Sequence, residues 1–242
     1  MLVLTINRIG VLANMALREK QMAERKARII AAAEKLMRKT GNTNFTMRAL
    51  AAEAEVSPAT PFNLFGSKES ILYELLLQSL QSFFQHGLNL KSDSPIERVL
   101  EAADIAVDLF VHDPEFLRPL YCFLLGVNDP AARPIFLRRS LKFWQLTFSS
   151  SYHGDTEVVS PEFDAIAMSL LANILGLLDV WVHKDISDEE FRLLLKRGVI
   201  LQVWPIAKAK DLPALKRLFN ETLSSPTKLS QINALQDVVS AT

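Results

Sequence analysis

The sequence predicts an all-α fold, with three small helices at the N-terminus, a larger helical bundle behind them and about ten helices in all. Apolar residues recur at spacings of three and four along most of the 242-residue chain. Only eight glycines are present, and the alternating apolar pattern typical of strands is scarce. About half of the residues are apolar and 22% are charged, which is an ordinary soluble globular composition.

Residues 1–22 are expected to form a flexible extension. Their apolar run is short and has no basic segment before it, so we do not expect a signal peptide. Met15 and Met22 are alternative start sites. The single cysteine, Cys122, excludes an internal disulfide and fits a reducing cytoplasm.

The first helix of the folded part is expected over Arg25–Lys39. A Gly/Asn-rich segment, TGNTN, follows it and ends the periodic pattern. One face of this helix carries the apolar residues Ile29, Ile30, Ala33, Leu36 and Met37.

Hydroxyl residues mark the starts of three further helices. Thr46 can cap a short helix that runs to Ala54, and Ser57 can cap a second one. Ser67 can cap a longer third helix, with Glu69 near its positive end. The buried stripe of that third helix is expected to comprise Ile71, Leu72, Leu75, Leu76, Leu80 and Phe83.

Polar and proline-containing segments divide the rest of the chain into six more helices. We expect these helices at Ser94–His112, Glu115–Leu125, Ala131–Ser151, Glu162–His183, Glu189–Lys208 and Pro213–Leu223. Residues 224–242 are expected to be a loosely ordered tail.

The most apolar stretch, Ile166–His183, contains Asn173 and Asp179. An internal aspartate is costly in a membrane span. We therefore interpret the stretch as a buried helix and expect no membrane partner.

The net charge of zero hides an asymmetry. Residues 1–85 contain 11 basic and 7 acidic residues, a net of +4, while the remainder contains 16 and 20, a net of −4. A basic front fits contact with a polyanion, although a solvated helix face explains the same numbers.

The segment TMRALAAEAEVSPATPFNLF has the pattern of a helix-turn-helix. Leu50 and Ala54 supply the core of the first helix, and the small Ala51 lets the second helix approach. The rest of the expected core comprises Val56, Ala59, Phe62 and Phe65. Residues 57–63 would then present the start of the second helix to a DNA major groove.

At this point the sequence resembles the tetracycline-repressor (TetR) family of transcription regulators. The resemblance covers about residues 25–81 and rests on RIIAAAEKLM, FTMRALAAEAEVS, TPFNLF and GSKESIL in this order. It implies a DNA-binding domain over residues 23–68, with its motif at about 46–65, and an effector-binding and dimerisation domain over residues 69–223. Beyond residue 90, only helix number and length resemble the family.

Three residues depart from the family pattern. Glu55 stands in the turn where glycine is usual, and a left-handed conformation there costs about 1 kcal/mol. Phe62 replaces a tyrosine whose hydroxyl commonly meets a phosphate. Pro61 replaces Leu or Ile; with Ser57 as the cap, Pro58 is the first helical residue and Pro61 removes one helix hydrogen bond.

The resemblance and residue chemistry together select the DNA contacts. Helix N-termini suit phosphate oxygens, so we expect Thr46, Arg48 and Lys68, which lie at helix starts, to contact phosphates. The second group lies nearest the bases, where Asn63 suits an adenine edge and Ala59 or Thr60 a thymine methyl. The full predicted set is Thr46, Arg48, Ser57, Ala59, Thr60, Phe62, Asn63 and Lys68.

The same resemblance implies a homodimer on double-stranded operator DNA. The dimer helices would be the two long ones at 162–183 and 189–208, with Leu170, Asn173, Gly176, Leu177 and Val199 at the interface. An apolar small-molecule effector is expected among the middle helices, near Tyr121, Cys122, Phe123, Trp144 and Phe148. For each of these side chains, ordinary core packing is the competing interpretation.

We expect a ligand-responsive repressor in the cytoplasm. The sequence contains no HExxH, GxSxG or phosphate-binding glycine loop and no metal spacing among the histidines, so no enzyme activity, cofactor or metal is expected. Two alternatives stay open: a helical ligand-binding or protein-interaction module with a degenerate DNA-binding unit, and a helical lipid-handling enzyme.

Overall fold

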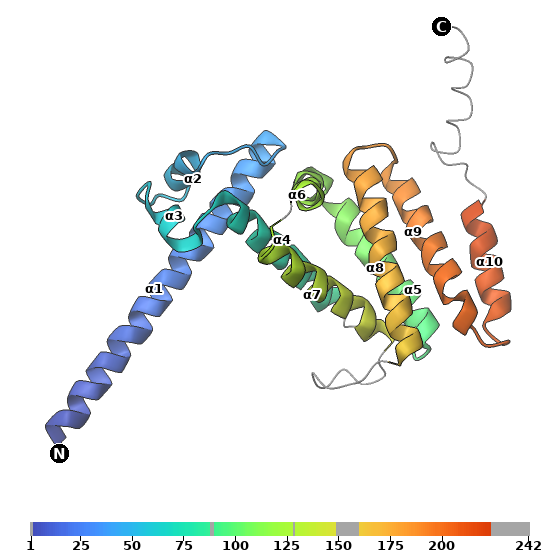
Figure 1. Cartoon of the computed structure of the whole chain (residues 1–242), viewed down its shortest axis with the longest axis horizontal. Helices are drawn as coiled ribbons and strands as arrows, with labels where there is room; N and C mark the ends of the chain where they lie inside the picture. The colour runs from blue at the N-terminus through green and yellow to red at the C-terminus, as the bar shows by residue number, and fades with distance from the viewer. Residues whose placement is uncertain (1, 88–89, 128, 149–159, 224–242) are drawn as a thin grey trace, which may run out of the picture. The chain divides into compact units, whose positions relative to one another are not determined.

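The computed structural model describes residues 2–87, 90–127, 129–148 and 160–223. These residues form ten α-helices and one short 3₁₀ helix, and no strand occurs among them (Figure 1). The chain divides into two compact units, Met1–Leu75 and Leu76–Thr242. The predicted all-α class, with three small helices ahead of a larger helical part, is confirmed.

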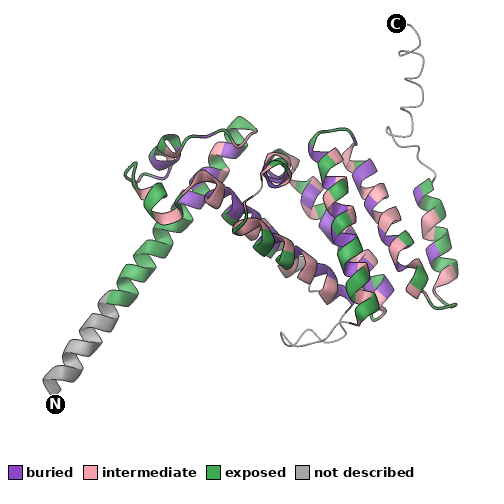
Figure 2. Ribbon diagram, viewed as in Figure 1, coloured by how far each residue is buried: buried purple, intermediate pink, exposed green. Residues whose placement is uncertain are grey.

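Helix α1 extends from Leu2 to Thr40, far beyond the predicted start at Arg25. A flexible extension was expected over residues 1–22, but residues 2–22 are helical. The sequence reason is that residues 15–28 are nearly all strong helix formers and include no proline. Their side chains are all exposed (Figure 2), and packing begins only at Ile29.

The first unit also contains α2 (Met47–Glu53), α3 (Thr60–Phe65) and the start of α4 (Lys68–Gly87). The Thr46 cap is confirmed, because its hydroxyl accepts the Ala49 N–H at 3.1 Å. Helix α2 packs against both α1 and α3. The core of this unit comprises Ile29, Ile30, Ala32, Ala33, Met37, Phe45, Leu50, Ala51, Ala54, Ile71, Leu72, Tyr73 and Leu75.

The second unit is a bundle in which α9 has neighbours on three sides. Helix α9 packs against α5, α8 and α10, and α8 packs in addition against α6 and α7 (Figure 1). After the rest of α4, the helices of this unit are α5 (Pro95–His112), α6 (Pro114–Gly126), α7 (Ala132–Thr147), α8 (Pro161–Val182), α9 (Asp188–Val203) and α10 (Leu212–Leu223). The predicted tail at 224–242 lies outside the described residues.

The prediction that one helix continues to Lys208 is wrong. Helix α9 ends at Val203, and Trp204–Ile206 forms a 3₁₀ turn. Pro205 is the cause, because its ring and missing N–H do not allow the α-helix to continue.

Among the described residues, α8 is the one helix long and apolar enough to cross a membrane by length and composition. Core helices of soluble proteins meet the same criterion. Here α8 packs on three other helices, yet only 39% of its most apolar window is buried. The described residues therefore leave a substantial part of its apolar surface uncovered.

Phe110 lies at the centre of the second unit. Its ring centroid is 4.9 Å from those of Phe83 and Tyr121 and 5.8 Å from those of Trp181 and Phe191. These four partners belong to α4, α6, α8 and α9, and most of the contacts are edge-to-face. One α5 side chain thus joins four other helices.

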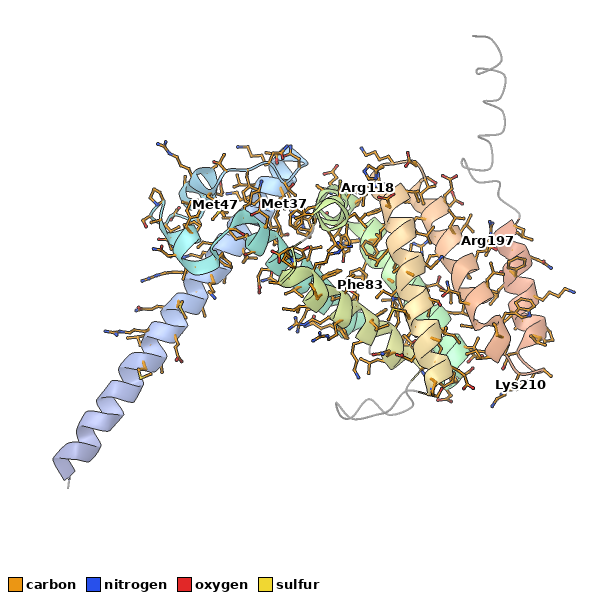
Figure 3. All side chains as sticks on the ribbon, in the orientation of Figure 1. Met37, Met47, Phe83, Arg118, Arg197 and Lys210 are labelled. Atoms are coloured by element: carbon orange, nitrogen blue, oxygen red, sulfur yellow. The ribbon has the colours of Figure 1, made fainter. Side chains whose placement is uncertain are left out.

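A polar network closes one end of the same cluster. The Asp188 carboxylate accepts hydrogen bonds from the Arg118 guanidinium at 2.7 Å and from the Trp181 indole N–H at 2.8 Å. The Arg118 guanidinium, labelled in Figure 3, also lies 4.6 Å from the centre of the Trp181 ring. These contacts connect α6, α8 and the start of α9.

Replacing Phe110 by alanine should lower the free energy of unfolding by about 3–5 kcal/mol, because the deletion empties a site shared by five helices. Urea denaturation followed by circular dichroism measures this loss. The control is Ile135→Ala on α7, whose side chain is 47% exposed and should cost within about 0.5 kcal/mol. A Phe110→Ala loss no larger than the control would show that the cluster does not stabilise the unit.

Candidate nucleic-acid interface and ligand cavity

The turn after α2 has the hydrogen bonds of a Schellman helix end. The Val56 N–H bonds to the Ala51 carbonyl at 3.0 Å, and the Glu55 N–H bonds to the Ala52 carbonyl at 3.2 Å. Glu55 takes the left-handed position of this motif, with φ of 53°. A side chain there costs about 1 kcal/mol relative to glycine. The turn therefore keeps the geometry expected of a helix-turn-helix despite its residue type.

Small residues bring α2 and α3 together, as predicted. Leu50 is fully buried, and Ala51 and Ala54 are almost so. Because neither alanine extends beyond Cβ, the two helices can pack closely, and they are in direct contact.

The reading helix α3 starts later than predicted. Ser57 does not cap it; Ser57 begins a turn in which its carbonyl accepts the Thr60 N–H at 2.9 Å, and α3 begins at Thr60. Pro58 lies in this turn. Pro61 is the second helical residue, where an N–H has no partner within the helix, so the expected loss of one hydrogen bond does not occur. The Ser57 and Thr60 hydroxyls bond to each other at 2.8 Å.

The prediction that Ala59 and Phe62 are core residues is wrong. Pro61 is buried, whereas Ala59 is exposed and the Phe62 side chain is 53% exposed. With the helix starting at Thr60, the inner positions are Pro61, Leu64 and Phe65, at helical spacing.

The outer face of α3 is formed by Ala59, Phe62 and Asn63, which we call the reading face. All three residues are exposed and follow the spacing of one helix face. The Asn63 side-chain amide makes no hydrogen bond to any other described residue. This face therefore offers two apolar groups and one free amide to solvent.

The remaining predicted DNA contacts lie at the starts of α2 and α4. Thr46 and Arg48 are exposed, and Arg48 makes no hydrogen bond or ion pair within the described chain. Lys68 is half-buried, and its ammonium donates to the Thr43 carbonyl at 3.2 Å. Lys68 thus holds the loop between α1 and α2. No local sequence pattern indicates this bond, because its partners are 25 residues apart.

The second unit contains a small, partly open aromatic cavity of about 40 Å³. Of the five predicted ligand residues, Tyr121 and Trp144 line it. Lining residues that the sequence did not single out include Phe83 (labelled in Figure 3), Phe110, Phe136 and Phe143. They come from three helices, α4, α5 and α7, so local sequence patterns could not bring them together.

Three of the predicted ligand residues lie elsewhere. Cys122 is exposed, because it follows Tyr121 on α6 and lies about 100° further around the helix. Phe123 is buried but does not line the cavity. Phe148 ends α7 and stacks on Phe163, with ring centroids 4.9 Å apart.

The hydroxyl groups of the cavity wall are already bonded. The Tyr121 hydroxyl lies 3.3 Å from Ser79 Oγ, and Ser79 in turn donates to the Leu76 carbonyl. Burial raises the pKa of Tyr121, so its hydroxyl stays protonated. Ser140 Oγ donates to the Phe136 carbonyl at 3.0 Å. The cavity therefore suits apolar material.

The predicted dimer residues separate into two groups. Leu170 and Val199 are fully buried inside the protomer, so their assignment to an interface is wrong. Asn173 packs inward: a Cβ added to Gly198 of α9 would lie 2.5 Å from its Oδ1. Leu177 is half-buried, and Gly176 is exposed.

Helix α8 has an exposed face of small and apolar side chains. It comprises Ala165, Met168, Ala172 and Gly176, and the Met168 side chain is 50% exposed. Nothing lies within 4 Å of a Cβ added at Gly176. This surface accounts for part of the uncovered apolar area of α8.

No metal site accompanies these features in the part of the chain that the structure describes. There, no group of three or more His, Cys, Asp or Glu side chains could hold an ion.

Comparisons with known proteins agree with this geometry. Residues 29–75 match the family model described as bacterial regulatory proteins, tetR family. No curated protein matches the chain significantly.

Solved structures with the same fold cover most of the chain. A TetR transcriptional regulator from Rhodococcus sp. RHA1 has a TM-score of 0.64 at 15% identity, covering 78% of this chain and 100% of its own. A putative TetR-family regulator from Syntrophomonas wolfei has a TM-score of 0.58 at 25% identity, covering 75% and 96%. A regulator of the same family from Streptomyces coelicolor has a TM-score of 0.57 at 14% identity, covering 90% and 97%.

Glu55→Gly should raise the free energy of unfolding by about 0.5–1 kcal/mol, because glycine adopts the left-handed conformation without strain. Urea denaturation measures the gain. Glu55→Ala is the matched control, since it removes the carboxylate and keeps the strain. An equal gain in both variants would assign the effect to the charge.

Proposed function

We propose that the chain, whose residues 29–75 match the tetR family model, is a ligand-responsive repressor. It binds a palindromic operator as a homodimer and leaves the DNA when an apolar small molecule binds. It acts in the cytoplasm and catalyses no reaction. The observation that carries the proposal is the exposed reading face of α3, with its free Asn63 amide and bare Phe62 ring.

The reading face suits base edges in a major groove. The Asn63 amide can donate to and accept from an adenine edge, and Ala59 and Phe62 can contact thymine methyl groups. The Phe62 side chain is 53% exposed on a six-residue helix, so about half of its surface has no partner in the described residues. Contact with DNA would cover this surface.

Phosphate contacts would position this face. The unpaired Arg48 at the start of α2 combines a cation with the N–H groups of a helix N-terminus. Thr46 caps the same helix, and its hydroxyl hydrogen is free to donate to a phosphate oxygen. Lys68 contributes less directly, since it holds the neighbouring loop.

The exposed face of α8 is the proposed dimer interface. The other described helices of the protomer leave part of its apolar surface uncovered. Gly176 allows a second helix to come close to this surface. A two-fold dimer would place two reading helices about 34–36 Å apart, one turn of DNA.

The proposed release from DNA depends on the small size of the cavity. A cavity of about 40 Å³ is far below the roughly 300–1,000 Å³ of typical ligand pockets. An effector must therefore displace wall residues such as Leu80 and Phe83 of α4. Helix α4 is continuous from Lys68, in the first unit, to Gly87. Displacement of the cavity-wall residues of α4 can therefore move the N-terminal end of the same helix.

The alternative is a ligand-binding or interaction module whose DNA-binding unit has lost function. The strained Glu55 and the missing hydroxyl at Phe62 favour it. DNA binding decides between the two proposals.

We expect the protein to bind one palindromic sequence, selected from random DNA or found beside its own gene, with affinity that falls steeply with salt. Asn63→Ala should relax preference at one base position, at a cost of about 1–3 kcal/mol. Arg48→Ala should weaken binding to all DNA sequences alike. It should also reduce the slope of log affinity against log salt concentration by about 1. Fluorescence anisotropy over a salt series measures both.

The control for these variants is Arg217→Ala on α10, an exposed cation of the other unit, which should leave DNA binding unchanged. Binding that shows neither sequence preference nor salt dependence would reject the repressor and leave the degenerate module. An unchanged base preference in Asn63→Ala would remove only its reading role.

Gly176→Arg should convert the dimer to a monomer, because the new side chain fits the protomer but occupies the surface of the proposed partner helix. Sedimentation velocity at micromolar concentration measures the change. Within the protomer, loss of a helical glycine stabilises α8 by about 1 kcal/mol, so unfolding does not mimic dissociation.

Gly126→Arg on α6 is the matched control. An added Cβ meets nothing within 4 Å there either, so the variant should remain dimeric. A Gly176→Arg protein that stays dimeric would place the interface on another surface.

A further inference from the structure

A surface groove of about 300 Å³ runs between α4 and α7 of the second unit. Its apolar part is formed by Leu77, Leu80 and Phe84, and its polar part by Gln81, Arg139 and Lys142. The groove therefore has an apolar floor and a basic edge.

The basic edge has no counter-charge in the described residues. Helix α7 carries four basic residues and no acidic one, and α4 has no acidic residue after Glu74. Arg133 is engaged with the Leu124 carbonyl at the end of α6. Arg139 and Lys142 form no hydrogen bond or ion pair with any described side chain. Two neighbouring cations thus border the groove without an anion.

The groove adjoins the aromatic cavity. Leu80 lines both of them. Phe84 of the groove touches Phe143 of the cavity edge-on, with ring centroids 5.9 Å apart. A single layer of side chains therefore separates the basic edge from the apolar interior.

The two compartments differ in the chemistry that they accept. The cavity hydroxyls of Tyr121 and Ser140 are bonded within the protein, so neither is free to bind a charged group. A charged group placed there would lose its hydration without compensation. At the groove, an anion gains two charge-assisted hydrogen bonds.

We infer that the effector is an anionic amphiphile: an alkyl chain that enters the cavity past Leu80, ending in a carboxylate or phosphate bound by Arg139 and Lys142. This inference rests on the proposed effector control and names the chemical class of that effector. The chain displaces the Leu80–Phe84–Phe143 layer and joins the cavity to the groove.

Calorimetric titration of the full-length protein with octanoate, octyl phosphate, octanol and octylammonium tests the class. Octanoate or octyl phosphate should bind about tenfold more tightly than octanol, and octylammonium more weakly still. The better of the two anions identifies the head group as carboxylate or phosphate. Equal binding of octanoate, octyl phosphate and octanol would overturn the inference.

The double variant Arg139→Gln, Lys142→Gln should abolish the advantage of the anions and leave octanol unchanged. Arg138→Gln is the matched control, an exposed arginine of the same helix that does not line the groove. An anion advantage that survives in the double variant, or disappears in Arg138→Gln, would also overturn the site.

DNA binding separates this inference from the proposed function. Specific DNA binding without any anion preference rejects the amphiphile and keeps the repressor. Anion binding through Arg139 and Lys142 without specific DNA binding rejects the repressor and keeps the site. Release of the operator by octanoate in the wild type, but not in the double variant, supports both.

Discussion

The packing of the second unit depends on the ring of Phe110. It contacts aromatic rings from four other helices and forms part of the wall of the cavity. The residue that stabilises the bundle therefore also limits the space open to a ligand. Any effector works against the same aromatic contacts that hold the helices together, and the enclosed space stays small until that cluster is rearranged.

The first unit tolerates residues that are unusual at helix ends because backbone hydrogen bonds determine the conformation there. Glu55 adopts a left-handed conformation after α2, and in the second unit Lys184 does the same after α8, with φ of 65°. In both turns two backbone hydrogen bonds complete the helix end without glycine. Pro61 is accommodated in a similar way, since it falls where α3 needs no N–H. Backbone bonding, more than residue type, fixes this domain.

Local patterns predicted the helices well and the orientation of side chains less well. The apolar stripe of α4, the Thr46 cap and the left-handed turn follow from spacing within a few residues. The error at Phe62 arose from placing the start of α3 two residues early, which rotates the buried face. The cavity wall, the Lys68–Thr43 bond and the burial of Leu170 depend on residues distant in sequence, and no local pattern contains them.

Cys122 is the only cysteine of the chain, it is exposed, and it directly follows a residue of the cavity wall. A fluorophore or spin label attached to its thiol would sit on α6, one residue from the site where a ligand must push. The natural sequence therefore carries a single attachment point for a reporter. Ligand entry could be followed spectroscopically without removing or adding a residue.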